Sequence, residues 1–160
     1  LGGLRVLDLS GLKLRDQDVP DLSRLQELHL LALRENPVGV WTMRKLQKNR
    51  SLRELFLDDS SVDDAALEAI AGIRSLRILS LAGTKITRAG LGRLSGMPML
   101  ESLNVERTQV AGGDLTDLLP RSLRVLGLAG CPATTDDAAR LRKARPKLEI
   151  HLQPLPSRDE

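Results

Sequence analysis

The chain has 160 residues, of which 41% are hydrophobic and 28% are charged, a balance typical of a folded domain rather than a disordered segment. Its net charge of +3 is too small to indicate nucleic-acid binding by itself, and its single cysteine excludes an internal disulfide framework and a cysteine-based zinc site. Because the chain has one Phe, one Trp and no Tyr, aliphatic side chains must form its core.

A short leucine pattern returns at a fixed spacing along the whole chain. Consecutive copies start 24 residues apart four times, then 23 and 25 residues apart. The starts are Leu4, Leu28, Leu52, Leu76, Leu100, Leu123 and, for a degenerate copy, Leu148. This register predicts one domain over residues 1–160, made of about six repeats, a C-terminal partial repeat and a tail over residues 153–160.

Each copy is expected to begin with a short strand. Positions 4 and 6 are apolar, as in Leu55 and Leu57 or Leu79 and Leu81, whereas position 5 between them varies freely. This alternation of period two predicts a strand with one buried face. Strands one repeat apart that are joined by crossovers must run parallel, so we expect a parallel sheet whose other face meets solvent or a partner.

The second half of each copy is expected to supply a helical layer. Leu67, Ile70 and Ile73 form an apolar stripe of helical spacing, and helices are predicted over residues 65–73 and 139–147. Suitable N-caps are Asp63, Thr87 and Thr134. The first two repeats are less regular, and we expect short 3₁₀ or irregular turns there. The strands and helices together predict an α/β, right-handed solenoid with a concave parallel sheet and convex helices.

Small polar residues occupy position 9 of most copies, where the chain must turn out of the strand. We expect them to satisfy backbone groups inside the turn rather than to act as nucleophiles, because no base recurs at a matching distance. Cys131, in the same row, is expected to be inert, and Leu12 breaks the row in the first copy. The row consists of Asn36, Ser60, Thr84, Thr108 and Cys131.

Other candidate chemistry has a simpler structural interpretation. The paired acids Asp58–Asp59 and Asp63–Asp64 could converge on Ca²⁺, but helix capping and a solvated rim explain them more simply. The basic run over residues 140–147 has no neighbouring aromatic to stack a base, and is expected to give the last repeat a polar end. The two histidines lie far apart in the sequence. We therefore expect no enzyme activity, no metal and no cofactor.

The copies resemble the leucine-rich repeat, in which apolar positions 1, 4, 6 and 11 frame a small polar position 9. The stretch "LAGTKITRAGLGRL" over residues 81–94 is similar to variants with Cys or Thr at position 9 and an "ITDAGL"-like continuation, although Arg88 replaces the common acidic residue. Those variants occur in substrate receptors of ubiquitin ligases and in bacterial repeat proteins. The resemblance implies a leucine-rich-repeat solenoid shaped as a horseshoe arc.

The exposed face of the sheet is where we expect function. Phe56 lies between Leu55 and Leu57, so its side chain should emerge on the solvent side as an interface anchor. We predict a non-catalytic module that binds a protein there. The alternatives are the substrate-recognition part of a ubiquitin-ligase receptor and a structural subunit of a larger complex. The predicted contact residues are Arg34, Phe56, Asp58, Ser80, Asn104, Glu106 and Arg107.

The sequence also suggests how the chain is used in a larger context. No apolar run is long enough to span a membrane, and neither a small-molecule substrate nor a nucleic-acid partner is expected. The chain opens in mid-pattern, so we expect a fragment or a processed chain, with an intracellular location favoured. The first strand, near Leu4–Leu9, should leave an apolar edge that further chain or a partner covers.

Overall fold

The computed structural model describes residues 3–133 and 135–154. Seven three-residue strands form one parallel sheet in which each strand pairs with the next along the chain, in the order β1-β2-β3-β4-β5-β6-β7. The strands are β1 (Val6–Asp8), β2 (Leu30–Ala32), β3 (Glu54–Phe56), β4 (Ile78–Ser80), β5 (Ser102–Asn104), β6 (Val125–Gly127) and β7 (Glu149–His151).

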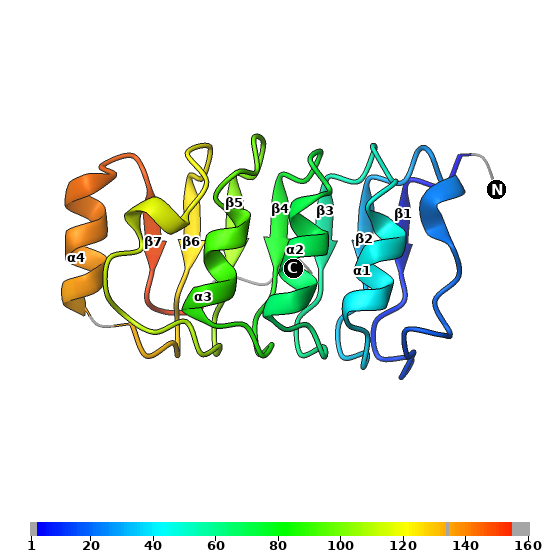
Figure 1. Cartoon of the computed structure of the whole chain (residues 1–160), viewed down its shortest axis with the longest axis horizontal. Helices are drawn as coiled ribbons and strands as arrows, with labels where there is room; N and C mark the ends of the chain where they lie inside the picture. The colour runs from blue at the N-terminus through cyan, green and yellow to red at the C-terminus, as the bar shows by residue number, and fades with distance from the viewer. Residues whose placement is uncertain (1–2, 134, 155–160) are drawn as a thin grey trace.

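The helices lie together on one side of this sheet, and successive repeats stand side by side in a row (Figure 1). They are η1 (Leu22–Arg24), α1 (Val40–Leu46), α2 (Asp64–Ala71), α3 (Arg88–Leu91), η2 (Gly92–Leu94), η3 (Thr116–Leu118) and α4 (Thr135–Ala144). The α/β solenoid expected from the sequence is confirmed. Of the predicted tail, residues 155–160 lie outside the described residues.

The strand register is the one that the leucine spacing predicts. Leu55 lies opposite Leu31 on one side and opposite Leu79 on the other, and Leu79 in turn lies opposite Leu103. These leucines, with Leu81, are at most 1% exposed. Each therefore packs between neighbouring repeats, and the core is a continuous stack of aliphatic side chains along the solenoid.

The small polar residues at position 9 bind the backbone, as expected. Thr84 Oγ1 donates to the carbonyl oxygen of Leu81 at 2.6 Å, and Thr108 Oγ1 donates to that of Val105 at 2.7 Å. Asn36 reaches back into the first repeat, where its Nδ2 donates to the Leu9 carbonyl at 2.8 Å. The half-buried Cys131 follows the same pattern, with its Sγ 2.9 Å from the Val105 carbonyl oxygen. The row closes the turns between strand and crossover.

Two helices were predicted at the right places with shifted ends. The helix expected over residues 65–73 is α2, capped by Asp63, whose Oδ1 accepts from Ala66 N at 3.1 Å. The helix expected over residues 139–147 is α4, which begins and ends earlier. Thr87 caps α3, as predicted, and the predicted cap Thr134 lies outside the described residues.

The expectation of an irregular second repeat was wrong. Residues 40–46 form the α-helix α1, although its N-cap Gly39 offers no side chain. The missing cap comes from the preceding repeat, where Asp16 Oδ1 accepts from Gly39 N at 2.8 Å and from Thr42 N at 3.1 Å. A helix start that is capped by a residue 23 positions away leaves no local sequence signal.

The two ends of the solenoid differ. In the first repeat, Val6 and Leu12 are 58% and 59% exposed, while Leu7 and Leu9 are only partly buried. At the other end, Arg145 donates to the carbonyl oxygens of Pro120 at 2.8 Å and Leu123 at 3.1 Å, and burial lowers its pKa. The basic run over residues 140–147 thus includes a side chain, just after α4, that binds the final repeat to the one before it.

Candidate protein-binding surface

The candidate surface is the helix-free face of the sheet. Its centre is formed by the residues at position 5 of consecutive repeats, which pair with one another across the sheet. Phe56 lies opposite Ser80, and Ser80 lies opposite Asn104, as the sequence predicts. The full row, which we call the central row, consists of Asp8, Ala32, Phe56, Ser80, Asn104 and Gly127, with His151 of β7 opposite Gly127.

The expectation that Phe56 is an exposed aromatic anchor was wrong. Its side chain lies outside the aliphatic core, on the helix-free side, yet the residue is only 7% exposed. Part of the cover is the guanidinium of Arg34 from the neighbouring repeat, which lies 4.4 Å from the centre of the ring. This distance is that of a cation–π contact. The phenyl ring therefore supports a charged group at the surface instead of meeting solvent itself.

Asp58 connects three neighbouring repeats on this face. Its Oδ2 pairs with Arg34 Nε at 3.2 Å, while its Oδ1 accepts from Ala82 N at 2.9 Å and from the hydroxyl of Ser80. The carboxylate of Asp58 thus holds Arg34 over the ring of Phe56. Four predicted contact residues, Arg34, Phe56, Asp58 and Ser80, form one connected cluster, which we call the Arg34 cluster.

A second ion pair lies at the edge of the helix-free face, beside the turns that follow the strands. Arg107 Nη1 and Nη2 bind Asp59 Oδ1 and Oδ2 at 3.1 Å each. Hydrogen bonding to Asp59 and the charge of Asp59 raise the pKa of Arg107 above its ordinary value. The two side chains are 59% and 45% exposed, so this pair is accessible to a partner. Of its two members, sequence reasoning selected Arg107 and missed Asp59.

The backbone at this edge is left-handed in every complete repeat. Position 8 has φ between 54° and 71°, and three repeats place glycine there. The other three place a charged residue, although a non-glycine residue in this conformation costs on the order of 1–2 kcal/mol. The six residues are Gly11, Glu35, Asp59, Gly83, Arg107 and Gly130. The recurrence of glycine at position 8 was the sequence signal for this edge.

The remaining two predicted residues lie on and beside β5. Asn104 Oδ1 accepts from Glu106 N at 3.0 Å, which fixes the chain where it leaves the strand. Glu106 is only 7% exposed. These two residues extend the face beyond the Arg34 cluster, with less accessible surface than the pair of Asp59 and Arg107.

The acid pairs considered for Ca²⁺ serve different sites. Asp58 and Asp59 join the helix-free face, whereas Asp64 accepts from Thr87 N at 2.8 Å at the start of the next helix. Within residues 3–133 and 135–154, no three His, Cys, Asp or Glu side chains are grouped to hold a metal ion. In the same described part, no helix is long and apolar enough to cross a membrane.

Residues 50–110 match the sequence profile of the family described as "Leucine rich repeat". This stretch contains β3, β4 and β5 and the two crossovers between them, and the same strand, turn and register continue on either side of it. Residues 50–110 are therefore leucine-rich repeats, and the flanking repeats continue the same fold.

Solved structures share the fold of this leucine-rich-repeat chain. A leucine-rich-repeat protein of Leptospira interrogans is 24% identical with a TM-score of 0.63, over 82% of this chain and 33% of that protein. Internalin C2 of Listeria monocytogenes is 22% identical with a TM-score of 0.64, over 88% of this chain and 59% of that one. The chain therefore spans about a third and about three-fifths of their lengths. No curated protein sequence matches it.

Proposed function

We propose that this leucine-rich-repeat chain is a non-catalytic module that binds another protein through the helix-free face of its sheet. The observation that carries the proposal is the set of fixed contacts across that face. Asp58 holds Arg34 in place over Phe56, and Arg107 is held by Asp59 two repeats away. Side chains that are already ordered lose less conformational entropy when a partner binds, which favours affinity.

The proposed contact set keeps the predicted residues but changes the role of Phe56. The ring supports the guanidinium of Arg34, and a partner meets the charged groups rather than the ring. The most accessible of these groups are Arg107 and its neighbour Asp59. The proposed set is Arg34, Phe56, Asp58, Asp59, Ser80, Asn104, Glu106 and Arg107.

The alternation of charge favours a protein as the partner. Arg34 and Arg107 stand beside Asp58 and Asp59, so the face presents both signs within neighbouring repeats. A nucleic-acid surface is predominantly positive, because it must neutralise phosphates. A mixed pattern instead suits a partner with its own complementary acids and bases, where charge pairing selects the partner and speeds association.

A structural subunit of a larger assembly is the second candidate. It is favoured by the exposed apolar side chains of the first repeat, Val6 and Leu12, beside the open edge of β1. Further chain or a partner subunit seated on this edge would bury them and pair the free strand. This candidate predicts that variants of the first repeat, rather than of the helix-free face, disrupt association.

The test compares matched variants in a capture experiment. Arg107→Ala and Asp59→Ala alter the helix-free face, while Arg93→Ala and Glu68→Ala remove another exposed pair on the helix side, whose Nη1–Oε2 distance is 2.8 Å. Proteins retained by the wild type and identified by mass spectrometry should be lost with the first two variants only. Equal loss with all four, or with the helix-side variants alone, would refute the proposal. The expected loss is the same whether the chain works alone or in a ubiquitin-ligase receptor, whereas a structural subunit would be released by variants of the first repeat instead.

A further inference from the structure

The only tryptophan of the chain is exposed on the helical side, away from the helix-free face proposed above to bind a protein. Trp41 lies near the start of α1, and 61% of its surface is accessible. The same helix buries Thr42, Met43 and Leu46 against the core, which leaves Trp41 on the outward side. Arg44 lies over the indole at 4.8 Å from the ring. An accessible Trp with an Arg beside it is the composition of an interface hot spot.

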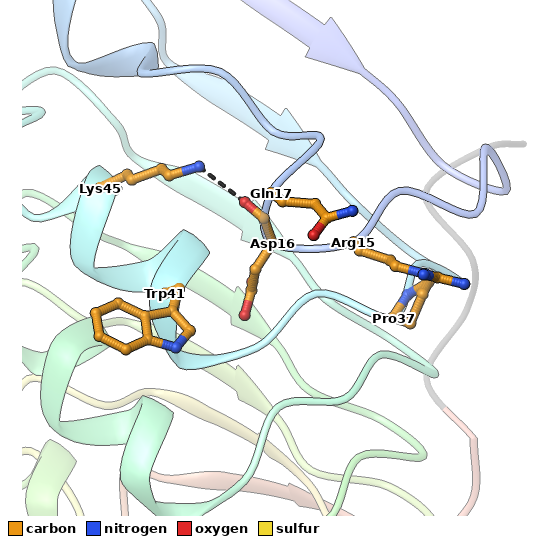
Figure 2. Close-up of a pocket in the computed structure, with 6 residues that line it drawn as sticks. All are labelled: Arg15, Asp16, Gln17, Pro37, Trp41 and Lys45. Carbon is orange, nitrogen blue, oxygen red and sulfur yellow. Dashed lines mark hydrogen bonds between the residues drawn. The ribbon is translucent and has the colours of Figure 1, made fainter.

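A surface pocket opens beside Trp41, between the crossover of the first repeat and α1. Its volume of about 540 Å³ is in the range of ligand-binding pockets. Figure 2 shows Trp41 and Lys45 on one side of Asp16, with Arg15 and Pro37 on the other. The lining residues are Arg15, Asp16, Gln17, Pro37, Trp41 and Lys45.

Hydrogen bonds between the first two repeats fix the floor of this pocket. Asp16 Oδ1 accepts from Gly39 N, Thr42 N and Thr42 Oγ1 at 2.8, 3.1 and 2.5 Å. Lys45 Nζ donates to the carbonyl oxygen of Asp16 at 2.8 Å (Figure 2). It also donates to the carbonyl oxygen of Val19 at 2.5 Å. The walls therefore belong to both repeats and are held in place before any ligand arrives.

The charge available to a ligand in this pocket is positive. Asp16 is the one acidic lining residue; burial raises its pKa, but hydrogen bonds from Gly39 and Thr42 outweigh that effect and hold the pKa below its ordinary value. The negative charge of the Asp16 carboxylate is thus already compensated by hydrogen-bond donors. The exposed side chain of Arg15 forms no ion pair with any residue in the described part of the chain. Lys45 adds a second positive charge to the lining, although its Nζ is bound to backbone carbonyls, and Arg44 lies nearby over Trp41.

We infer that this pocket binds an acidic segment of a protein partner, with a carboxylate at Arg15 and an apolar side chain against Trp41 and Pro37. Charge complementarity selects the acid, because Arg15 forms no ion pair within residues 3–133 and 135–154 and the carboxylate of Asp16 is occupied by hydrogen-bond donors. The exposed indole selects a neighbouring apolar group, whose contact removes both from water. Single-stranded nucleic acid fits less well, since successive bases need successive aromatic platforms and the pocket offers one. The pocket is separate from the helix-free face and does not depend on it.

The test begins with selection from a library of short random peptides displayed on phage. Peptides retained by the wild-type chain are depleted on a Trp41→Ala, Arg15→Gln double variant, so that only pocket-dependent sequences remain. We expect these sequences to carry Asp or Glu within two residues of Leu, Ile, Met or Phe. Absence of any variant-dependent sequence, or enrichment of neutral or basic ones, overturns the inference.

A selected peptide is then titrated while the tryptophan fluorescence is followed. Because the chain has one Trp and no Tyr, the emission reports on Trp41 alone. The acidic peptide should shift the emission to shorter wavelength, and its amide version, with Asn or Gln for Asp or Glu, should bind at least about tenfold more weakly. Arg15→Gln should weaken binding by a similar factor, whereas the remote control Arg121→Gln should not.

Two further outcomes would overturn the inference. One is equal affinity for the acidic and amide peptides. The other is a stronger response to an oligothymidylate than to the acidic peptide, which would make the pocket a nucleic-acid site. The pair Asp59→Ala and Arg107→Ala should leave this titration unchanged, so failure here and failure of the helix-free face are distinguishable.

Discussion

Asp59 and Arg107 form a two-point ion pair that passes directly over Gly83. The two residues are 48 positions apart in the chain and belong to the third and fifth repeats, with Gly83 at the same position of the fourth. A β-carbon at Gly83 would lie 2.1 Å from Asp59 Oδ1. The absence of a side chain in one repeat therefore lets the repeats on either side join their charges.

Gly83→Ala should cost more stability than the same change at Gly11. Both glycines have left-handed φ values, 66° and 71°, so both variants lose about 1–2 kcal/mol from backbone strain. Gly11 has open space for a β-carbon, whereas Gly83→Ala also displaces Asp59 and loses an exposed ion pair, about 0.2–1 kcal/mol more. Denaturant melts measure the excess, which should vanish in an Asp59→Ala background. An excess that persists there would show that the ion pair is not its cause.

Leu79→Ala should lower the free energy of unfolding by about 2–5 kcal/mol, because its side chain is 1% exposed and packs between two repeats. Leu12→Ala is the matched control, since Leu12 is 59% exposed and should change stability by less than about 0.5 kcal/mol. Urea melts followed by far-ultraviolet circular dichroism make the comparison. Similar losses in the two variants would contradict the core assignment.

Phe56→Ala should destabilise the protein by about 2–3 kcal/mol, although the ring faces away from the aliphatic core. The variant exposes buried neighbours and removes the surface on which Arg34 rests. The change in melting midpoint measures the loss, and Arg34→Ala should reproduce part of it. If Phe56→Ala melted as the wild type does, the ring would be accessible, as the sequence alone suggested.

Asp16→Asn should destabilise the protein at neutral pH by about 0.5–2 kcal/mol, because it weakens the cap that the first repeat gives to α1. The pKa of Asp16 is lowered in the folded state, so the carboxylate stabilises the fold above its unfolded value of 3.8. That contribution is lost as the pH falls below 3.8 through the folded pKa. Melts at pH 7 and near pH 3 should therefore show a smaller difference between variant and wild type at the lower pH. A difference that grew on acidification would contradict the assignment.

The leucine spacing was enough to predict the sheet, because each repeat meets the same neighbours. Leu55, Leu79 and Leu103 occupy equivalent places and pair in the expected register. The side-chain contacts between neighbouring repeats were harder to predict. Phe56 is covered in part by Arg34 from the preceding repeat, and α1 is capped by Asp16 from another. Contacts of this kind depend on how far a side chain reaches into the neighbouring repeat, which the period does not encode.

The most direct test of the binding face exchanges the charges of its exposed pair. The double variant Asp59→Arg, Arg107→Asp keeps an ion pair across Gly83 but reverses the charge that a partner meets at each end. With a partner obtained by capture, calorimetric titration should show at least a tenfold loss of affinity, about 1.4 kcal/mol, while the melting temperature stays close to that of the wild type. Unchanged affinity of this stable, charge-exchanged variant would contradict binding through the helix-free face.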